Sequence, residues 1–190
     1  MISDELKIIF LHPNKCGGKS VEKALWEIEP FPGSADHRTM QAHFNENEDR
    51  ALSYFKFMFC RNPWDRLVSI YYGRKQILGV KMPTFREFIL SANPSEDPCR
   101  AQITWIKTNV GIQIDFIGRF ERYNADWNKL NFMMSLPHVN KSKHKPYKEL
   151  YTQDLIKIVG KNYKEDIDFF GYSFDDFCDE NIDFFNKKSN

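Results

Sequence analysis

The sequence predicts an α/β protein: a single P-loop-like domain with a central parallel sheet flanked by helices. Short apolar runs alternate along the chain with segments whose apolar residues recur at helical spacing. The chain has 190 residues, of which 42% are hydrophobic, so one domain can bury a sizeable core. A glycine-containing loop separates the first apolar run from the first helical segment. We assign residues 1–174 to this domain and residues 175–190 to a C-terminal tail.

Each element of this domain is expected from a local pattern. Three apolar runs predict buried strands: Lys7–Leu11, Phe55–Phe59 and Ile114–Ile117. Helical spacing or capping patterns predict the helices: Ser20–Ile28, Glu46–Tyr54, from Pro63 onward, from Thr84 to before Pro94, Asp126–Met134 and Thr152–Asp168. Pro63 suits a first helical turn, because that turn needs no amide donor from it. Thr84 with Glu87 three residues later is a capping-box sequence.

The charge balance excludes functions that depend on a strongly basic chain. Lysine and arginine total 27 and aspartate and glutamate total 26, which leaves a formal charge of +1. Proteins that coat nucleic acid or bind membranes through polybasic segments carry a large basic excess. We therefore expect no nucleic-acid partner, and any anion site must be local.

Targeting and cysteine patterns predict a cytoplasmic protein. No run of about 18 apolar residues is present to span a membrane. The first residues, MISDELK, are acidic where a signal peptide carries a basic flank. The four cysteines, Cys16, Cys60, Cys99 and Cys178, are widely spaced without a C-x-x-C pair, so we expect free thiols and no metal site.

The loop after the first strand has the composition of an anion site. Between His12 and Ser20 it contains paired glycines, two lysines and a hydroxyl group: Lys15, Gly17, Gly18, Lys19 and Ser20. Glycines let backbone amides approach an anion, and the helix that begins behind them points its unpaired N–H groups at it. The plainer alternative is a glycine turn with solvated lysines.

The same loop ends in Gly-Lys-Ser, as a Walker A loop does, so a P-loop kinase that uses ATP and Mg²⁺ is an alternative. Two features weaken that reading. A Walker A loop has its first glycine where this chain has Pro13. Neither later strand ends in an acidic residue that would hold Mg²⁺.

A second basic segment follows the second strand, at the edge where open α/β sheets bind ligands. Arg61 stands before the expected helix and Ser69 lies further along it, so both are candidates for contacts to one phosphate. Asp65 and Arg66, between them, are expected to cap the helix or to form ion pairs at its start.

Four segments in order resemble the sulfotransferase superfamily, specifically its carbohydrate-type branch. The loop Asn14-Lys15-Cys16-Gly17-Gly18-Lys19-Ser20 is similar to the branch pattern PKTGGTS, with Cys16 and Lys19 where threonines are usual. Residues 61–69, RNPWDRLVS, are similar to the second motif of the branch. Residues 115–121, DFIGRFE, and 136–142, LPHVNKS, are similar to later stretches, and a Tyr163 to Tyr172 ending follows. The resemblance extends from Ile8 to Tyr172.

The resemblance implies in-line transfer of a sulfuryl group from 3′-phosphoadenosine 5′-phosphosulfate (PAPS) to an acceptor hydroxyl, on a saccharide or on another small hydroxyl compound. Adenosine 3′,5′-bisphosphate is then the product, and no metal is demanded. The residues that the resemblance assigns to the donor are Lys15, Cys16, Gly17, Gly18, Lys19 and Ser20 for the 5′-phosphosulfate, Arg61 and Ser69 for the 3′-phosphate, and Ser142 near the adenosine. Lys15 has the catalytic role of stabilising charge that grows on the leaving group.

A catalytic base must also take the proton of the acceptor, and histidine suits that role near neutral pH. His43 lies in a region where some relatives carry a catalytic histidine, and His37 is the second choice. Both assignments rest on position along the chain, because neither histidine lies in one of the four motifs.

The acceptor site is less defined by the sequence. Gln102 and Trp105 lie on an expected helix and are candidates for shaping it, although core packing is the plainer role for Trp105. Arg119 and Glu121 follow the third strand, either as structural ion-pair partners or as acceptor contacts. A catalytically inactive relative that keeps the nucleotide pocket is a further alternative, because Cys16 and Lys19 depart from the pattern.

Overall fold

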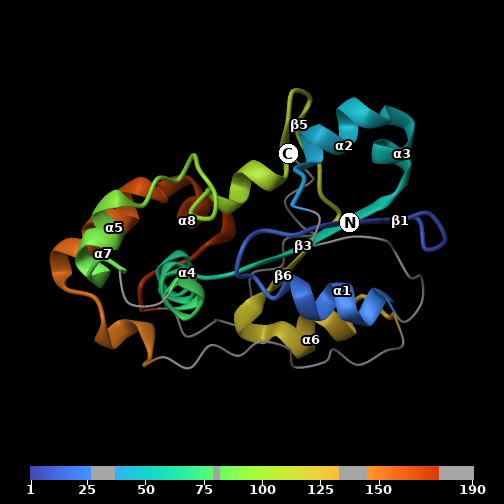
Figure 1. The fold of residues 1–190 in the computed structure, drawn as a ribbon. Helices are drawn as coiled ribbons and strands as arrows, with labels where there is room; N and C mark the ends of the chain where they lie inside the picture. Colours follow the sequence, from blue (N-terminus) through green and yellow to red (C-terminus); the bar gives the residue numbers. More distant parts are fainter. Residues whose placement is uncertain (27–36, 79–81, 133–144, 176–190) are drawn as a thin grey trace.

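A mostly parallel four-stranded sheet forms the centre of the protein, in the order β1-β2-β3-β6 (Figure 1). The computed structural model describes residues 1–26, 37–78, 82–132 and 145–175. The strands of this sheet are β1 (Ile2–Ser3), β2 (Ile8–Leu11), β3 (Phe55–Cys60) and β6 (Phe116–Arg119). β1 pairs antiparallel to β2, whereas β2, β3 and β6 are parallel to one another. The predicted fold class, α/β with helices flanking a central sheet, is confirmed.

Helices cover both faces of the sheet. The α-helices are α1 (Gly18–Trp26), α2 (Met40–Glu46), α3 (Glu48–Ser53), α4 (Pro63–Leu78), α5 (Phe85–Ser91), α6 (Tyr123–Asn128), α7 (Gln153–Asn162) and α8 (Lys164–Phe170). The short 3-10 helices are η1 (Gln102–Trp105), η2 (Phe120–Arg122) and η3 (Tyr147–Glu149). A small hairpin of β4 (Lys107–Thr108) and β5 (Gly111–Ile112), which the sequence did not predict, stands beside α2.

The two faces of the sheet bury different cores because alternate strand residues point in opposite directions. Ile8 and Phe10 of β2 face α1 and α6, and they pack with Trp127. Ile9 and Leu11 face the other layer, which contains α4, α5, α7 and α8. Figure 1 shows α1 and α6 together on one side of the strands, with α4 and its neighbours on the other.

Most predicted elements are found, and the differences have local causes. The third strand begins at Phe116 rather than Ile114, because the Asp115 carboxylate accepts from the Lys56 amide at 2.8 Å. The segment predicted as one helix over Glu46–Tyr54 belongs to α2 and α3, separated at Asn47, whose side chain caps α3. The capping box at Thr84 is confirmed.

Three further helix predictions need correction. α1 begins at Gly18, two residues before the predicted start. α6 spans only Tyr123–Asn128, where a helix over Asp126–Met134 was expected. The last predicted helix is divided into α7 and α8 at Tyr163, which leaves the helical conformation and donates its hydroxyl to the Cys99 carbonyl at 2.7 Å.

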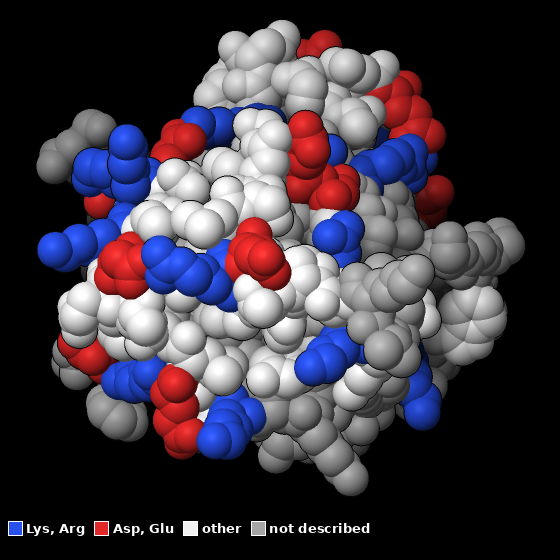
Figure 2. Space-filling view, turned by 60° about the vertical axis from the view of Figure 1, so that its left-hand side comes forward, with Lys and Arg blue, Asp and Glu red and all other residues white. Residues whose placement is uncertain are grey.

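Surface and cysteine chemistry agree with the composition. On the face shown in Figure 2, basic and acidic side chains are interspersed, as expected for a chain with a formal charge of +1. Cys16, Cys60 and Cys99 are free and buried, and Cys178 lies outside the described residues. Within the described residues, no helix has the length and apolar character needed to cross a membrane.

Candidate active site

The loop between β2 and α1 has a backbone shape that requires its glycines. Gly17 has a φ of +88°, a backbone conformation that residues with a side chain rarely adopt. Lys15 also has a positive φ, of +66°. A Cβ on Gly17 would lie 2.7 Å from the Tyr123 hydroxyl oxygen. A Cβ on Gly18 would lie 1.8 Å from the His12 ring. The loop therefore brings backbone close to its neighbours at both glycines.

Three side chains from outside the loop hold its carbonyl groups. The donors are Arg66 Nε to Asn14 at 2.9 Å, Arg61 Nη1 to Lys15 at 3.1 Å and Tyr123 Oη to Gly17 at 2.6 Å. In a trans peptide the N–H group points opposite to the C=O group. The amide of Gly18 therefore points away from Tyr123, and it opens α1, where the first N–H groups have no partner within the helix. This is the arrangement of an anion-binding helix N-terminus.

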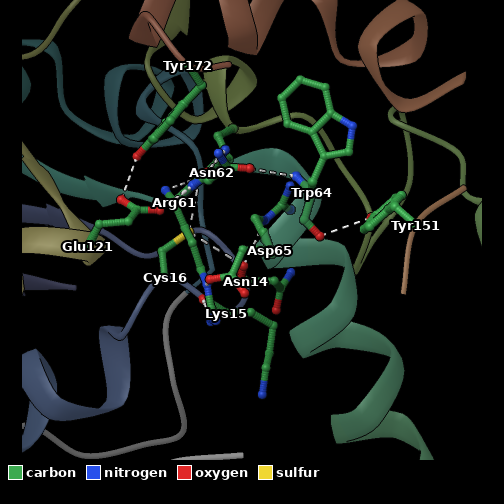
Figure 3. Close-up of polar contacts among 12 residues, drawn as sticks. Asn14, Lys15, Cys16, Arg61, Asn62, Trp64, Asp65, Glu121, Tyr151 and Tyr172 are labelled. Atoms are coloured by element: carbon green, nitrogen blue, oxygen red, sulfur yellow. Dashed lines mark hydrogen bonds and ion pairs between the residues drawn. The ribbon is translucent and has the colours of Figure 1, made fainter. Parts of the chain in front are cut away.

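Besides the buried Arg66, three further cations lie in the loop or against it. Lys15 and Lys19 belong to it, and Arg61 reaches it from the end of β3. Burial lowers the pKa of Lys15, and the nearby charges of Arg61 and Lys19 lower that pKa further. The Lys15 side chain runs beside α4 (Figure 3), where its Nζ lies 3.1 Å from the position that a Cβ on Gly73 would take. A bound anion would relieve the repulsion among these cations.

Arg61 is already engaged by protein groups. Its Nε donates to Asp65 Oδ2 at 2.8 Å, and its guanidinium lies 4.2 Å from the centre of the Phe120 ring. Ser69, which was expected to share a phosphate with Arg61, lies on α4 with 2% of its surface exposed. The third predicted segment of the donor site, with Ser142, lies outside the described residues.

The two charged residues at the start of α4 have different roles. Asp65 forms the expected ion pair, with Arg61. The prediction for Arg66 is wrong, because its side chain is fully buried and donates to the carbonyls of Asn14, Pro98 and Arg100 instead of pairing at the helix start. Asn62 caps the helix by accepting from the Trp64 amide at 3.0 Å (Figure 3).

The residues proposed for the acceptor site are largely structural. Gln102 and Trp105 are fully buried on η1, so Trp105 has the core-packing role that was the plainer expectation, and Gln102 is not exposed to line an acceptor site. Glu121 accepts from the Asn62 amide at 2.6 Å and from the Tyr172 hydroxyl at 2.9 Å (Figure 3). Burial raises the pKa of Glu121, and these hydrogen bonds oppose the rise. Arg119 is also buried, and it stacks on Tyr172.

The two candidate catalytic histidines occupy different environments. His37 is exposed, and its Nδ1 lies 2.8 Å from the His12 carbonyl oxygen at the end of β2. A carbonyl oxygen only accepts, so Nδ1 donates and the Nε2 of the neutral ring carries the lone pair. His43 lies on the buried face of α2 with Met40 and Phe44, and only 1% of it is exposed. The geometry therefore favours His37 over His43 as a proton acceptor.

His12 is a site residue that the sequence analysis placed only at a strand end. Its Nδ1 lies 2.9 Å from Glu22 Oε1, and its ring lies 4.5 Å from the ring of His37 and directly against Gly18. Burial lowers the pKa of His12, although Glu22 opposes this effect. His12 thus joins the strand end, the first helix and His37.

The fold and the site together define a class: α/β proteins with a helix N-terminus and basic side chains at the carboxyl edge of a parallel sheet, an arrangement suited to an anionic ligand. Within that class the chain belongs to the sulfotransferase family, whose sequence model, described as "Sulfotransferase family", matches residues 1–173. The resemblance seen in the four sequence segments is confirmed.

Two curated relatives are carbohydrate sulfotransferases. Carbohydrate sulfotransferase 14 of Homo sapiens is 24% identical over 180 residues, and carbohydrate sulfotransferase 14 of Mus musculus is 23% identical over the same length. Each alignment covers 73% of this chain and 47% of the relative, so the chain spans about half the length of the curated relatives it matches. No solved structure gives a significant match.

Proposed function

We propose that the protein transfers a sulfuryl group from PAPS to a hydroxyl group of a saccharide. The observation that carries this proposal is the loop after β2, where clamped carbonyls, a helix N-terminus and Lys15 form an anion site in a chain of the sulfotransferase family. The names of the two relatives support a carbohydrate acceptor. The acceptor itself would bind across the same edge of the sheet.

The chemical step forms one S–O bond and breaks another. The acceptor oxygen attacks sulfur in line, and the bond between sulfur and the bridging phosphate oxygen breaks, so that the product nucleotide keeps that oxygen. Lys15 stabilises the charge that develops on the bridging oxygen, and the N–H groups at the start of α1 stabilise the phosphate. Lys15 would reach that oxygen by rotating its side chain away from Gly73.

We assign proton removal to His37. Its Nδ1 is fixed on the His12 carbonyl, so Nε2 is left to accept the proton of the acceptor hydroxyl. Arg61 is assigned to the 3′-phosphate, which would share the guanidinium with Asp65. The adenosine 3′,5′-bisphosphate that remains after transfer would keep its contacts with the loop after β2 and with Arg61.

The first experiment is calorimetric titration of the protein with adenosine 3′,5′-bisphosphate in EDTA, beside a titration with ATP and Mg²⁺. Tight binding of the bisphosphate without a comparable response to ATP is the expected result. Preference for ATP with Mg²⁺ would overturn the proposal in favour of a P-loop kinase. A screen of saccharide acceptors with labelled PAPS then tests turnover, and binding without transfer to any acceptor would indicate an inactive relative.

A further inference from the structure

One buried side chain, Gln102, is bonded to both segments that we assign to the donor. It is fully buried on η1. Its hydrogen bonds are Cys16 Sγ to Oε1 at 3.1 Å, the Arg61 amide to Oε1 at 2.8 Å, Nε2 to the Arg61 carbonyl at 2.9 Å and Nε2 to Asp166 Oδ2 at 3.4 Å. A single amide therefore contacts the loop after β2 and the first residue after β3.

The contact with Arg61 imitates a strand pairing. Gln102 pairs with both the N–H and the C=O of Arg61, as the backbone of a neighbouring strand would. The last paired residue of β3 is Cys60, opposite Arg119, so Arg61 lies one residue beyond the regular ladder. Gln102 thus fixes the peptide groups on both sides of the Arg61 Cα, and with them the direction in which the guanidinium leaves the backbone.

Asp166 sets the orientation of the Gln102 amide. Its carboxylate accepts from the backbone amides of Gln102 and Ile103, each at 2.8 Å, and it is itself fully buried. Because a carboxylate only accepts, the NH₂ group of Gln102 must face it. The oxygen is then directed to the Cys16 thiol and the Arg61 amide.

These contacts close a ring through the site. Gln102 joins Cys16 to the backbone of Arg61, and the Arg61 guanidinium returns to the loop by donating to the Lys15 carbonyl at 3.1 Å. We propose that Gln102 is a positioning residue that couples the anion loop to Arg61, so that the 5′ and 3′ phosphates of one nucleotide are bound as a unit. This inference rests on the proposed function, because it takes the donor to carry both phosphates.

The coupling has a measurable consequence that loss of stability alone would not produce. Adenosine 5′-monophosphate and adenosine 3′,5′-bisphosphate differ only by the 3′-phosphate, so the ratio of their dissociation constants reports what Arg61 contributes. Gln102→Glu keeps an acceptor of similar size but removes the donor to the Arg61 carbonyl. In this variant we expect the ratio, taken as the dissociation constant of the monophosphate over that of the bisphosphate, to fall about tenfold, because residues of one hydrogen-bond network are coupled to that degree.

Three other variants separate positioning from folding. Ile103→Val lowers stability at the adjacent buried position of η1 and should leave the ratio of dissociation constants unchanged. Cys16→Ala removes the hydrogen bond from the loop to Gln102 and should lower the ratio less than Gln102→Glu does. Cys16→Ser should keep the ratio of the unaltered protein, because the serine hydroxyl can donate to Gln102. Thermal melts establish that each variant is folded before titration.

The outcomes are distinct for the two proposals. If the unaltered protein binds neither nucleotide, the proposed function fails and the coupling fails with it. If the unaltered protein prefers the bisphosphate but folded Gln102→Glu and Cys16→Ala keep the same preference, the proposed function stands and the positioning role is wrong. Should Gln102→Glu not fold, the pair Cys16→Ala and Cys16→Ser decides the question alone.

Discussion

The segments that follow β2 and β3 end at the same edge of the sheet, but they hold their positive charge differently. In the first, Lys15 is half-buried and Lys19 is exposed, and the loop carbonyls are bonded to side chains behind it. In the second, Arg61 is buried and paired with Asp65. Among the described residues neither Lys15 nor Lys19 forms an ion pair, so an anion at the first segment would displace none there, whereas an anion at the second would share a guanidinium that is already engaged.

This difference suggests a division of labour between the two segments. In the proposed function, the first would provide groups that respond to charge developing during the reaction, because Lys15 is held among other cations and has a lowered pKa. The second provides a fixed recognition point whose strength depends on competition with Asp65. Removal of Lys15 from the first segment should mainly change turnover, and variants in the second segment should mainly change nucleotide preference.

The largest expected effect is that of Lys15→Ala. Removal of the cation next to the leaving group should lower kcat by about 10³-fold. Adenosine 3′,5′-bisphosphate should still bind, although more weakly, because Arg61 is untouched. Lys19→Ala is the matched control in the same loop and should mainly weaken nucleotide binding. Turnover that is unchanged in Lys15→Ala would remove the basis of the distinction between the segments.

The second effect in size concerns the two histidines. His37→Gln should lower kcat by about 10²-fold, because the base near the end of β2 is lost, while nucleotide affinity stays the same. His43→Gln changes a buried residue of α2, so it should lower the melting temperature but keep kcat in the protein that remains folded. Steady-state kinetics with thermal melts test both variants, and the reverse pattern would return the base to His43.

Steric change in the loop comes third. In Gly18→Ala the new Cβ would lie 1.8 Å from the buried His12 ring, so the ring and its contact with Glu22 must shift. We expect the free energy of unfolding to fall by about 1–3 kcal/mol and nucleotide binding to weaken. Gly73→Ala places its Cβ 3.1 Å from the flexible end of Lys15, so it should fold normally. Denaturant unfolding compares the two, and equal stability would show that the loop is not rigid.

A smaller effect is expected from Asp65→Asn, which tests the second segment directly. Replacing the carboxylate frees Arg61 Nε from its ion pair, while Arg61 Nη1 keeps its hydrogen bond to the Lys15 carbonyl. The 3′-phosphate then no longer competes with a carboxylate, and affinity for adenosine 3′,5′-bisphosphate should rise about threefold. Affinity for adenosine 5′-monophosphate should not change. Weaker binding of the bisphosphate would mean that Asp65 orients Arg61 rather than competing for it. Titration calorimetry distinguishes these results.

The smallest effect is a displacement of the pH profile. In the proposed mechanism Lys15 acts as a cation, and burial and its cationic neighbours lower its pKa below that of an ordinary lysine. Activity should therefore be lost, as pH rises, earlier than for an ordinary lysine. A bound anionic donor favours the charged form, so the basic limb of kcat should lie at higher pH than that of kcat/KM. Coincident limbs would show that the donor does not contact Lys15.

The sequence predicted those parts of the site that depend on local pattern. The paired glycines and lysines after a buried strand identified the loop, and Arg61 was expected beside it because parallel strands end at one edge. Arg66 was misassigned because nothing in its local sequence shows that it is fully buried. Gln102 was misassigned for a related reason: its partner Asp166 lies 64 residues away in the chain. The proximity of His37 to His12 likewise depends on tertiary structure.

The hydrogen bonds that shape the loop also determine the stage of folding at which the site forms. Its partners Arg61, Arg66, Gln102 and Tyr123 lie 46, 52, 86 and 106 residues further along the chain from the groups they contact. Such distant contacts form only after long stretches of chain have closed on themselves. A nascent chain that has emerged only to α5 would carry the complete loop motif without its binding shape. Nucleotide binding would therefore serve as a probe of complete folding, during synthesis or during refolding.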